Sequence, residues 1–364
     1  MNDRSYMQMA LKLAARGKGR TSPNPMVGAV IVKGDKVIAS GHHRMAGTAH
    51  AEAAALKKAG PRAEGATLYV NLEPCCHTGK RTPPCTKTII KAGIKEVVTA
   101  MIDPNPRVSG RGLKELRKAG IKTRTGILKD AALKLNEGFI KHITLKRPFV
   151  ILKIAQSIDG KIATAAGESK WITGPEARER VHELRNEVDA LLVGSGTVKA
   201  DNPSLDCRVS GGRNPFRIIV DSSLKISLNS KVLRYDDGKT LIATTKKADK
   251  RKLNSLLKKG IRVLLIKTKS GRVDLNCLMD ELGRLDITTV MIEGGSSVAA
   301  SALADRIVDK AMFFTAPKII GGVNAIPSVG GKSPALLSEA IMLKDVQVTL
   351  LGDDMLIEGY VNYS

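Results

Sequence analysis

Short apolar runs alternate with helical patterns along the first 147 residues of the chain. The strand-like runs cover residues 27–32, 36–40, 66–72, 96–102 and 121–126. The helical patterns cover residues 50–60, 85–93, 112–120 and 129–144. Before the first strand, an amphipathic helix is predicted whose apolar face consists of Tyr6, Met9, Ala10, Leu13 and Ala14. Strands that alternate with helices in this way predict a layered α/β domain.

The rest of the chain repeats the alternation. Its strand-like runs cover residues 149–155, 189–194, 216–221, 240–245, 262–267 and 288–295, and a helix is predicted over 175–188. The last four of these runs are apolar and rich in β-branched residues, which is typical of strands buried on both faces. Residues 346–363 predict a terminal hairpin. A second α/β domain is therefore expected.

Length and composition agree with two globular domains. The chain has 364 residues, of which 43% are hydrophobic and 26% charged, and a chain of this length suits about two domains. We place the junction near residues 145–149 and predict domains at 1–146 and 148–364. No apolar run is long enough for a membrane span, and the N-terminus lacks the apolar core of a secretory signal. We therefore expect a cytoplasmic protein, in which clustered cysteines favour a metal or catalytic role over disulfides.

The net charge of +24 is unevenly distributed. Residues 1–147 carry +18 and residues 148–364 carry +6. A basic first half could attract nucleic acid or a phosphorylated small molecule, although scattered surface lysines explain it equally well. Aromatic residues make up only 3% of the chain, which argues against modules that stack nucleic-acid bases.

Candidate metal chemistry lies in the stretch L-E-P-C-C-H-T-G-K-R-T-P-P-C, residues 72–85, which holds three of the five cysteines. Upstream, His50 and Glu52 form an H-A-E pair, and H-x-E followed by P-C is most of the signature of zinc-dependent nucleotide deaminases. A catalytic zinc takes three protein ligands and lowers the pKa of a water in its fourth position. Glu52 is then a candidate general base.

The second cysteine ligand is displaced from its usual place. The signature P-C-x-x-C would put it at position 78, which is a threonine, so Cys76 and Cys85 are the candidates. Neighbouring side chains tend to diverge, whereas Cys85 opens a predicted helix whose N-terminus favours a thiolate. We predict one zinc ion held by His50, Cys75 and Cys85. His77 as a fourth ligand would make the site structural and leave Glu52 without a function.

H-A-E followed by E-P-C-x-H-x-G and T-P-P-C resembles the deaminase domain of the bifunctional riboflavin-biosynthesis deaminase/reductases. Residues 22–32, 41–52 and 103–112 resemble further motifs of this family. The resemblance implies a cytidine-deaminase-like three-layer domain, with the second zinc cysteine after T-P-P. It also implies substrate contacts from Asn24, His43, Lys80, Asp103 and Asn105. His43 suits the family pattern G-x-H better than His42 does, and Arg81 could replace Lys80 because this stretch is one residue longer than the commonest version in the family.

The second domain has no metal cluster and no G-x-G-x-x-G fingerprint. The Gly-Gly turn within 290–303 could bind a cofactor phosphate at a helix start, but an ordinary turn would look the same. Residues 152–163, 169–174, 184–205 and 293–295 resemble the reductase domain of the same family. That domain is similar to dihydrofolate reductase in fold and uses NADPH, although no local pattern here distinguishes NADPH from NADH.

The resemblance assigns roles around the reductase site. The implied cofactor contacts are Ala155, Trp171, Thr197, Asp201, Ser222, Gly295, Ser296 and Ser297. The implied substrate contacts are Ser169, Arg185, Leu205, Arg208 and Glu293. The guanidinium groups of Arg185 and Arg208 would suit bidentate hydrogen bonds to a phosphate. Without the family resemblance, we would interpret both residues as members of surface ion pairs. Lys153 and Asp201 are candidates to polarise the sugar.

The predicted protein is a bifunctional hydrolase and oxidoreductase. It would deaminate 2,5-diamino-6-ribosylamino-4(3H)-pyrimidinone 5′-phosphate at zinc and then reduce the ribosyl chain to ribityl with NADPH. Its expected partners are this small molecule and copies of itself in a homo-oligomer, without nucleic acid or membrane. A tRNA adenosine deaminase is one alternative, disfavoured by the displaced cysteine and the 217 reductase-like residues. A non-catalytic zinc module fused to a nucleotide-binding domain is another, disfavoured by Glu52.

Overall fold

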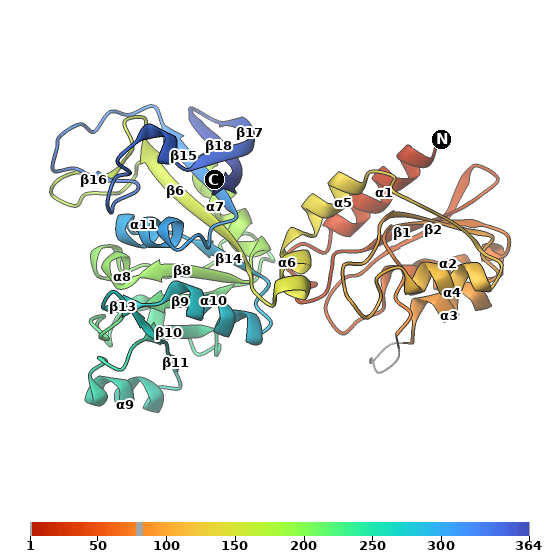
Figure 1. Cartoon of the computed structure of the whole chain (residues 1–364), viewed down its shortest axis with the longest axis horizontal. Coiled ribbons are helices and arrows are strands. Elements are labelled where there is room, and N and C mark those ends of the chain that lie inside the picture. The colour runs from red at the N-terminus through yellow and green to blue at the C-terminus, as the bar shows by residue number, and fades with distance from the viewer. Residues whose placement is uncertain (1, 78–82, 364) are drawn as a thin grey trace. The chain divides into compact units, whose positions relative to one another are not determined.

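The computed structural model describes residues 2–77 and 83–363 (Figure 1). The chain forms two compact units, Met1–Arg147 and Pro148–Ser364. Each unit contains its own main sheet. Within the described ranges, no helix combines the length and the apolar character that a membrane crossing needs.

Unit 1 contains a five-stranded sheet in the order β2-β1-β3-β4-β5. Its strands are β1 (Gly28–Lys33), β2 (Lys36–His42), β3 (Thr67–Leu72), β4 (Glu96–Met101) and β5 (Lys122–Thr125). β1 runs antiparallel to β2 and β3, whereas β3, β4 and β5 are mutually parallel. The β1–β2 hairpin turns on Gly34 and Asp35, which both have positive φ (53° and 59°), as a two-residue type I′ turn requires.

Helices cover both faces of this sheet (Figure 1). α1 (Asp3–Ala15) and α5 (Lys129–Leu135) lie on one face, and α2 (Ala51–Ala59), α3 (Cys85–Lys91) and α4 (Arg111–Lys118) lie on the other. The predicted apolar face of α1 is confirmed at Tyr6, Ala10 and Ala14, but Met7 is also fully buried, and Met9 and Leu13 are only partly buried. The result is the three-layer arrangement that the sequence predicted.

The single helix predicted over 129–144 is wrong, because the chain forms α5 and α6 (Glu137–Leu145) with a break at Asn136. Asn136 is 1% exposed, and its backbone leaves helical geometry at φ −112° and ψ 21°. Its side chain accepts a hydrogen bond from the N–H of Met26 (2.8 Å) and donates one to the Met26 carbonyl (3.0 Å). The two hydrogen bonds between this buried amide and the distant Met26 thus stabilise the break more than a continuous helix would be stabilised by its own backbone hydrogen bonds.

Unit 2 contains a nine-stranded sheet in the order β11-β10-β9-β8-β14-β6-β15-β18-β17. Its strands are β6 (Phe149–Ser157), β8 (Ala190–Gly194), β9 (Phe216–Val220), β10 (Thr240–Thr244), β11 (Arg262–Leu265), β14 (Thr289–Ile292), β15 (Lys310–Ala316), β17 (Met342–Leu351) and β18 (Asp354–Asn362). All pairings from β11 to β15 are parallel, and the last two are antiparallel. Four short strands make two further pairs, β7 (Lys161–Ala163) with β16 (Ile326–Pro327) and β12 (Thr268–Lys269) with β13 (Arg272–Val273).

Alternate residues of the central strands enter two separate cores. Phe149 and Ile151 pack in one core with α7 (Pro175–Glu187) and α9 (Lys250–Lys258). Val150 and Leu152 pack in the other with α10 (Leu275–Arg284) and α11 (Ser296–Ala304). Among the described residues, the other helical elements of unit 2 are α8 (Ser195–Asp201) and the short 3₁₀ turns η2 (Lys231–Leu233) and η3 (Leu337–Glu339), and unit 1 has the 3₁₀ turn η1 (Gly60–Ala63). Two buried faces explain why these strands are mostly apolar.

Burial on both faces is confirmed for β9, β10 and β14 but is wrong for β11. β11 is an edge strand, and its Leu265 is 60% exposed. β15 was not predicted at all, although it is an interior strand that lies between β6 and β18. The terminal hairpin is confirmed as β17–β18, with β17 at the other edge of the sheet.

Candidate functional sites

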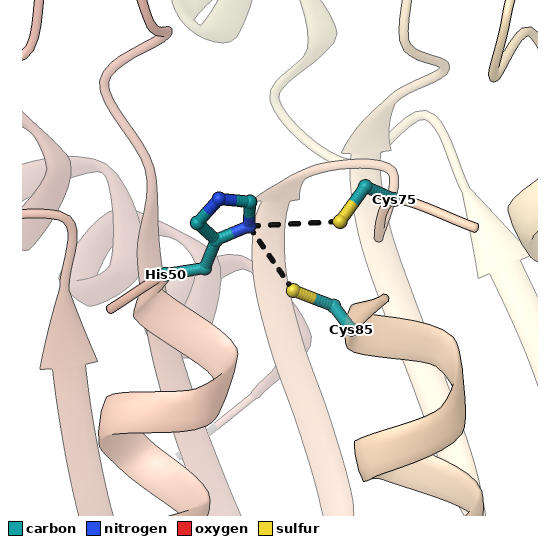
Figure 2. Close-up of side chains that lie close together, drawn as sticks. All are labelled: His50, Cys75 and Cys85. Atoms are coloured by element: carbon teal, nitrogen blue, oxygen red, sulfur yellow. Dashed lines mark hydrogen bonds between the residues drawn. The ribbon is translucent and has the colours of Figure 1, made fainter. Parts of the chain in front are cut away.

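A histidine and two cysteines converge in unit 1 (Figure 2). His50 is the N-cap residue of α2, Cys75 follows β3, and Cys85 is the first residue of α3. His50 Nδ1 lies 3.2 Å from Cys85 Sγ and 3.6 Å from Cys75 Sγ, and the three atoms lie within 4.8 Å of one another. Tetrahedral zinc, with Zn–N about 2.1 Å and Zn–S about 2.3 Å, separates N and S by about 3.6 Å. The spacing therefore fits a zinc ion.

The chemistry of the three residues also fits a cation. Cys75 and Cys85 are both buried, and Cys85 starts a helix, where the partial positive charge favours a thiolate. A hydrogen bond with Cys75, together with burial, nevertheless raises the pKa of Cys85. Because metal ligation requires deprotonated cysteines, a divalent cation at this group would hold both side chains as thiolates. Cys76 and His77 are not part of the group, so the part of the chain that the structure describes offers three candidate ligands here, the number that catalytic zinc sites use.

Glu52 lies beside this group. It sits in the first turn of α2 and is 4% exposed. Burial and the negative charge of Cys75 raise its pKa, while the nearby His50 and a hydrogen bond with Cys85 act in the opposite direction. A buried carboxyl beside the proposed metal ligands, with its pKa raised by burial, is the kind of group that serves as a general base.

His43 and Asn24 extend the site on one side. The ring of His43 lies edge-on to that of His50, with centroids 5.5 Å apart. His43 Nδ1 lies 3.1 Å from the Ala49 carbonyl, which can only accept, so Nδ1 carries the proton. Nε2 then accepts from the Asn24 amide at 3.2 Å. Because burial lowers the pKa of His43, a neutral His43 orients the Asn24 amide beside the metal group.

Asp103 and Asn105 lie on the loop between β4 and α4. The Asp103 carboxylate accepts from the Asn105 N–H (2.9 Å), and the Asn105 side chain accepts from the Arg107 N–H (3.0 Å). The loop is anchored by Glu73, whose buried carboxylate accepts three backbone N–H groups and which the sequence reasoning missed. Lys80 and Arg81 both lie outside the described residues, so the choice between them stays a prediction.

Unit 2 contains a cavity of about 1030 Å³. Its wall includes all thirteen residues predicted for the reductase site, namely Ala155, Ser169, Trp171, Arg185, Thr197, Asp201, Leu205, Arg208, Ser222, Glu293, Gly295, Ser296 and Ser297. They come from segments spread over more than a hundred residues. Their placement on one wall is a structural finding, whereas the role of each residue stays a prediction.

Contrary to the expectation from the sequence, Arg185 is not free to bind a phosphate with both arms of its guanidinium group. Its Nε and Nη2 donate to the two carboxylate oxygens of Glu293 at 2.7 and 2.8 Å, and its Nη1 donates to the Asp206 carbonyl. The pair is largely buried, so it is not a surface ion pair either. Burial raises the pKa of Glu293, but Arg185 and Lys153 outweigh burial and hold that pKa below its usual value. In this structure the guanidinium fork orients a carboxylate.

His182 is a wall residue that the sequence reasoning missed. It lies one helical turn before Arg185 on α7, and its buried Nδ1 has no hydrogen-bond partner among the described residues. Burial lowers the pKa of His182. The spacing of three residues from Arg185, which puts both on one helix face, was the available signal.

Comparisons with known proteins agree with these two sites. Residues 1–101 match the family model of the cytidine and deoxycytidylate deaminase zinc-binding region, and residues 148–357 match that of the RibD C-terminal domain. Fold and sites thus define a two-domain protein that joins a cytidine-deaminase-like unit with a His/Cys/Cys zinc-type site to a reductase unit. This class of protein differs from both alternatives considered from the sequence, a tRNA adenosine deaminase and a non-catalytic zinc module fused to a nucleotide-binding domain.

Relatives identify the family over the full length. The chain is 43% identical to riboflavin biosynthesis protein RibD of Actinobacillus pleuropneumoniae, over 99% of this chain and 96% of the relative. The solved structure of Acinetobacter baumannii RibD has a TM-score of 0.90 at 37% identity and covers 99% of both chains. The Thermotoga maritima diaminohydroxyphosphoribosylaminopyrimidine deaminase/5-amino-6-(5-phosphoribosylamino)uracil reductase has a TM-score of 0.87 at 38% identity, over 99% of this chain and 98% of that one. The chain belongs to the RibD family of bifunctional deaminase/reductases of riboflavin biosynthesis.

Proposed function

We propose that unit 1 hydrolyses the 2-amino group from 2,5-diamino-6-ribosylamino-4(3H)-pyrimidinone 5′-phosphate. Unit 2 then reduces the ribosyl group of the product to ribityl with NADPH. The observation that carries the proposal is the convergence of His50, Cys75 and Cys85 with the buried carboxyl of Glu52. The Thermotoga relative, whose name contains the same two activities, supports the choice of substrate.

In the deamination step, bound zinc would lower the pKa of a water so that hydroxide is available near neutral pH. Glu52 takes the proton of the attacking water and delivers it to the amino group that leaves as ammonia. His43 stays neutral and orients the Asn24 amide toward the pyrimidine. Asp103 and Asn105 take part in binding the pyrimidine and ribose phosphate of the substrate, together with Lys80 or Arg81.

In the reduction step, NADPH would supply a hydride to C1′ of the ribose. The Gly294–Gly295 turn at the start of α11 offers backbone N–H groups to the cofactor phosphates. Ser296 Oγ is buried at this turn without a partner among the described residues, which fits a polar ligand. Lys153 is packed near Glu293 and Arg185, and it is our candidate to polarise the opening sugar oxygen.

We further propose that the protein is a homo-oligomer in the cytoplasm. β17 is an edge strand, and Val346, Val348 and Leu350 on it are 51%, 61% and 72% exposed. A long apolar edge invites pairing with a second copy. None of the five cysteines forms a disulfide with another described residue, which suits a reducing compartment.

The decisive test is a coupled assay with the diaminopyrimidinone phosphate and NADPH. Glu52→Ala is expected to keep its zinc and to lose ammonia release by about 10²–10⁴-fold. NADPH oxidation should then also stop, but it should resume when the deaminated intermediate is added. Deamination by the variant at a near wild-type rate would show that Glu52 is not the general base.

A further inference from the structure

One buried carboxylate in unit 1 has no part in the proposed chemistry. Glu73 is 2% exposed, and it lies directly after β3, two residues before Cys75. Its Oε2 accepts from the N–H groups of Asp103 (3.1 Å) and Gly110 (2.8 Å), and its Oε1 accepts from the N–H of Leu113 (3.1 Å). A carboxylate with three backbone donors is a strong, charge-assisted acceptor.

These three donors mark the two ends of the loop between β4 and α4. Asp103 begins the loop, Gly110 is the N-cap of α4, and Leu113 lies in the first turn of that helix. The loop residues between them are tied to each other through the side chains of Asp103 and Asn105. One side chain therefore closes the whole loop, and its negative charge also complements the helix N-terminus.

The same segment packs tightly against the start of α4. A Cβ atom added to Gly112 would lie only 2.2 Å from the Pro74 carbonyl oxygen, so the helix rests directly on the residue before Cys75. The Glu73 N–H also donates to the Met101 carbonyl at the end of β4 (3.0 Å). Backbone contact and the carboxylate thus hold the loop against the segment that carries Cys75.

We propose that Glu73 is a positioning residue for deamination, which fixes Asp103 and Asn105 relative to the metal group. This rests on the proposed function of those two residues as substrate contacts. A carboxylate is needed because both of its oxygens accept hydrogen bonds. In a glutamine, the amide nitrogen would replace one oxygen, and this nitrogen cannot accept a hydrogen bond from a backbone N–H. Weaker anchoring would loosen the substrate contacts without removing a reacting group.

The test is steady-state deamination by full-length Glu73→Gln. We expect KM for the diaminopyrimidinone phosphate to rise about tenfold, with kcat changed by less than about threefold. Zinc content and reduction of added deaminated intermediate should equal those of the wild type. Glu115→Gln is the matched control, since it also removes one negative charge, here from α4. The glutamine oxygen can still accept from the Thr86 hydroxyl (3.0 Å in the wild type). The KM of this control should not change. An unchanged KM in a zinc-loaded Glu73→Gln protein would overturn the proposal.

Asn105→Ala separates this proposal from the proposed function. If Asn105→Ala raises KM and Glu73→Gln does not, only the positioning role fails; if Asn105→Ala has no effect, the assigned substrate contact fails and the positioning role with it. In the Glu73→Gln/Asn105→Ala double variant, the increase in KM should be smaller than the product of the two single increases, because part of the Glu73 effect acts through Asn105, and fully multiplying effects would show that Glu73 acts elsewhere. If Glu73→Gln does not fold, Gly110→Ala strains the same loop end at φ 83° with space around its Cβ. It should raise KM by a smaller factor, and an unchanged KM would again overturn the proposal.

Discussion

The two sites of this chain are built in different ways. In unit 1, the proposed metal ligands and base come from two short segments, residues 50–52 and 75–85, and two of the ligands lie at helix starts. In unit 2, the predicted residues line one large cavity but come from segments between 155 and 297. Metal chemistry requires particular residue types at restricted spacings, which a sequence displays. A cavity depends on how strands and loops are placed, and many residue types can form its wall.

The largest expected effect tests the local character of the first site. Cys85→Ser should lose zinc and reduce deamination at least about a hundredfold, because one thiolate of three ligands is gone. Cys76→Ser should keep zinc and activity, since Cys76 lies outside the group. Zinc analysis and ammonia release measure both. Zinc loss in Cys76→Ser instead would reverse the ligand assignment.

The second prediction concerns the buried ion pair of the reductase cavity. Arg185→Ala should destabilise unit 2 by about 3–5 kcal/mol, because the buried Glu293 carboxylate would lose the guanidinium that donates to both of its oxygens. Urea unfolding followed through Trp171, the single tryptophan, measures it. Arg180→Ala on the same helix is the control, since its 2.8 Å pair with Glu183 is far more exposed and should cost about 0–1 kcal/mol. Equal losses in the two variants would mean that burial of the Arg185 pair has no special effect.

A third, smaller effect is expected at the helix break of unit 1. Asn136→Ala removes both hydrogen bonds to Met26 and should destabilise unit 1 by about 1–3 kcal/mol. Because Met26 is two residues from Asn24, KM for deamination should rise as well. Asn254→Ala, an exposed helical position, is the control and should change stability little. Thermal unfolding of both variants decides whether this buried amide holds the substrate segment.

The smallest effect concerns Asp3, which binds Arg124 and accepts from the Tyr69 hydroxyl (2.5 Å). The hydrogen bond with Arg124, followed by that with Tyr69, holds the pKa of Asp3 below its usual 3.8. A depressed folded pKa means that the stabilisation is present above 3.8 and is lost as pH falls through the lower folded value. Asp3 is partly exposed, so Asp3→Asn should cost at most about 1 kcal/mol at neutral pH. The difference from wild type in urea unfolding should shrink at low pH, and a constant difference would contradict the ion-pair account.

Prediction from sequence succeeded where a pattern is repeated locally. The alternation of strands and helices is confirmed for most elements of both units, and His50, Cys75 and Cys85 do converge. It failed where a distant partner decides. The break at Asn136 depends on Met26, 110 residues away, and the exposure of β11 depends on which strand ends the sheet order. β15 was not predicted although it is mostly apolar, because no local pattern marks it as an interior strand of the sheet.

The sequence by itself determined the two domains' chemistry: the types and spacing of metal ligands, the nearby carboxyl, and a family resemblance over the whole length. Only the tertiary structure decided how the remaining polar groups are used. Arg185 meets Glu293 across 108 residues, and Glu73 meets the N–H groups of Gly110 and Leu113 across 37 and 40 residues. The type of a metal ligand depends on a single residue, whereas a buried hydrogen bond exists only when folding brings donor and acceptor within about 3 Å.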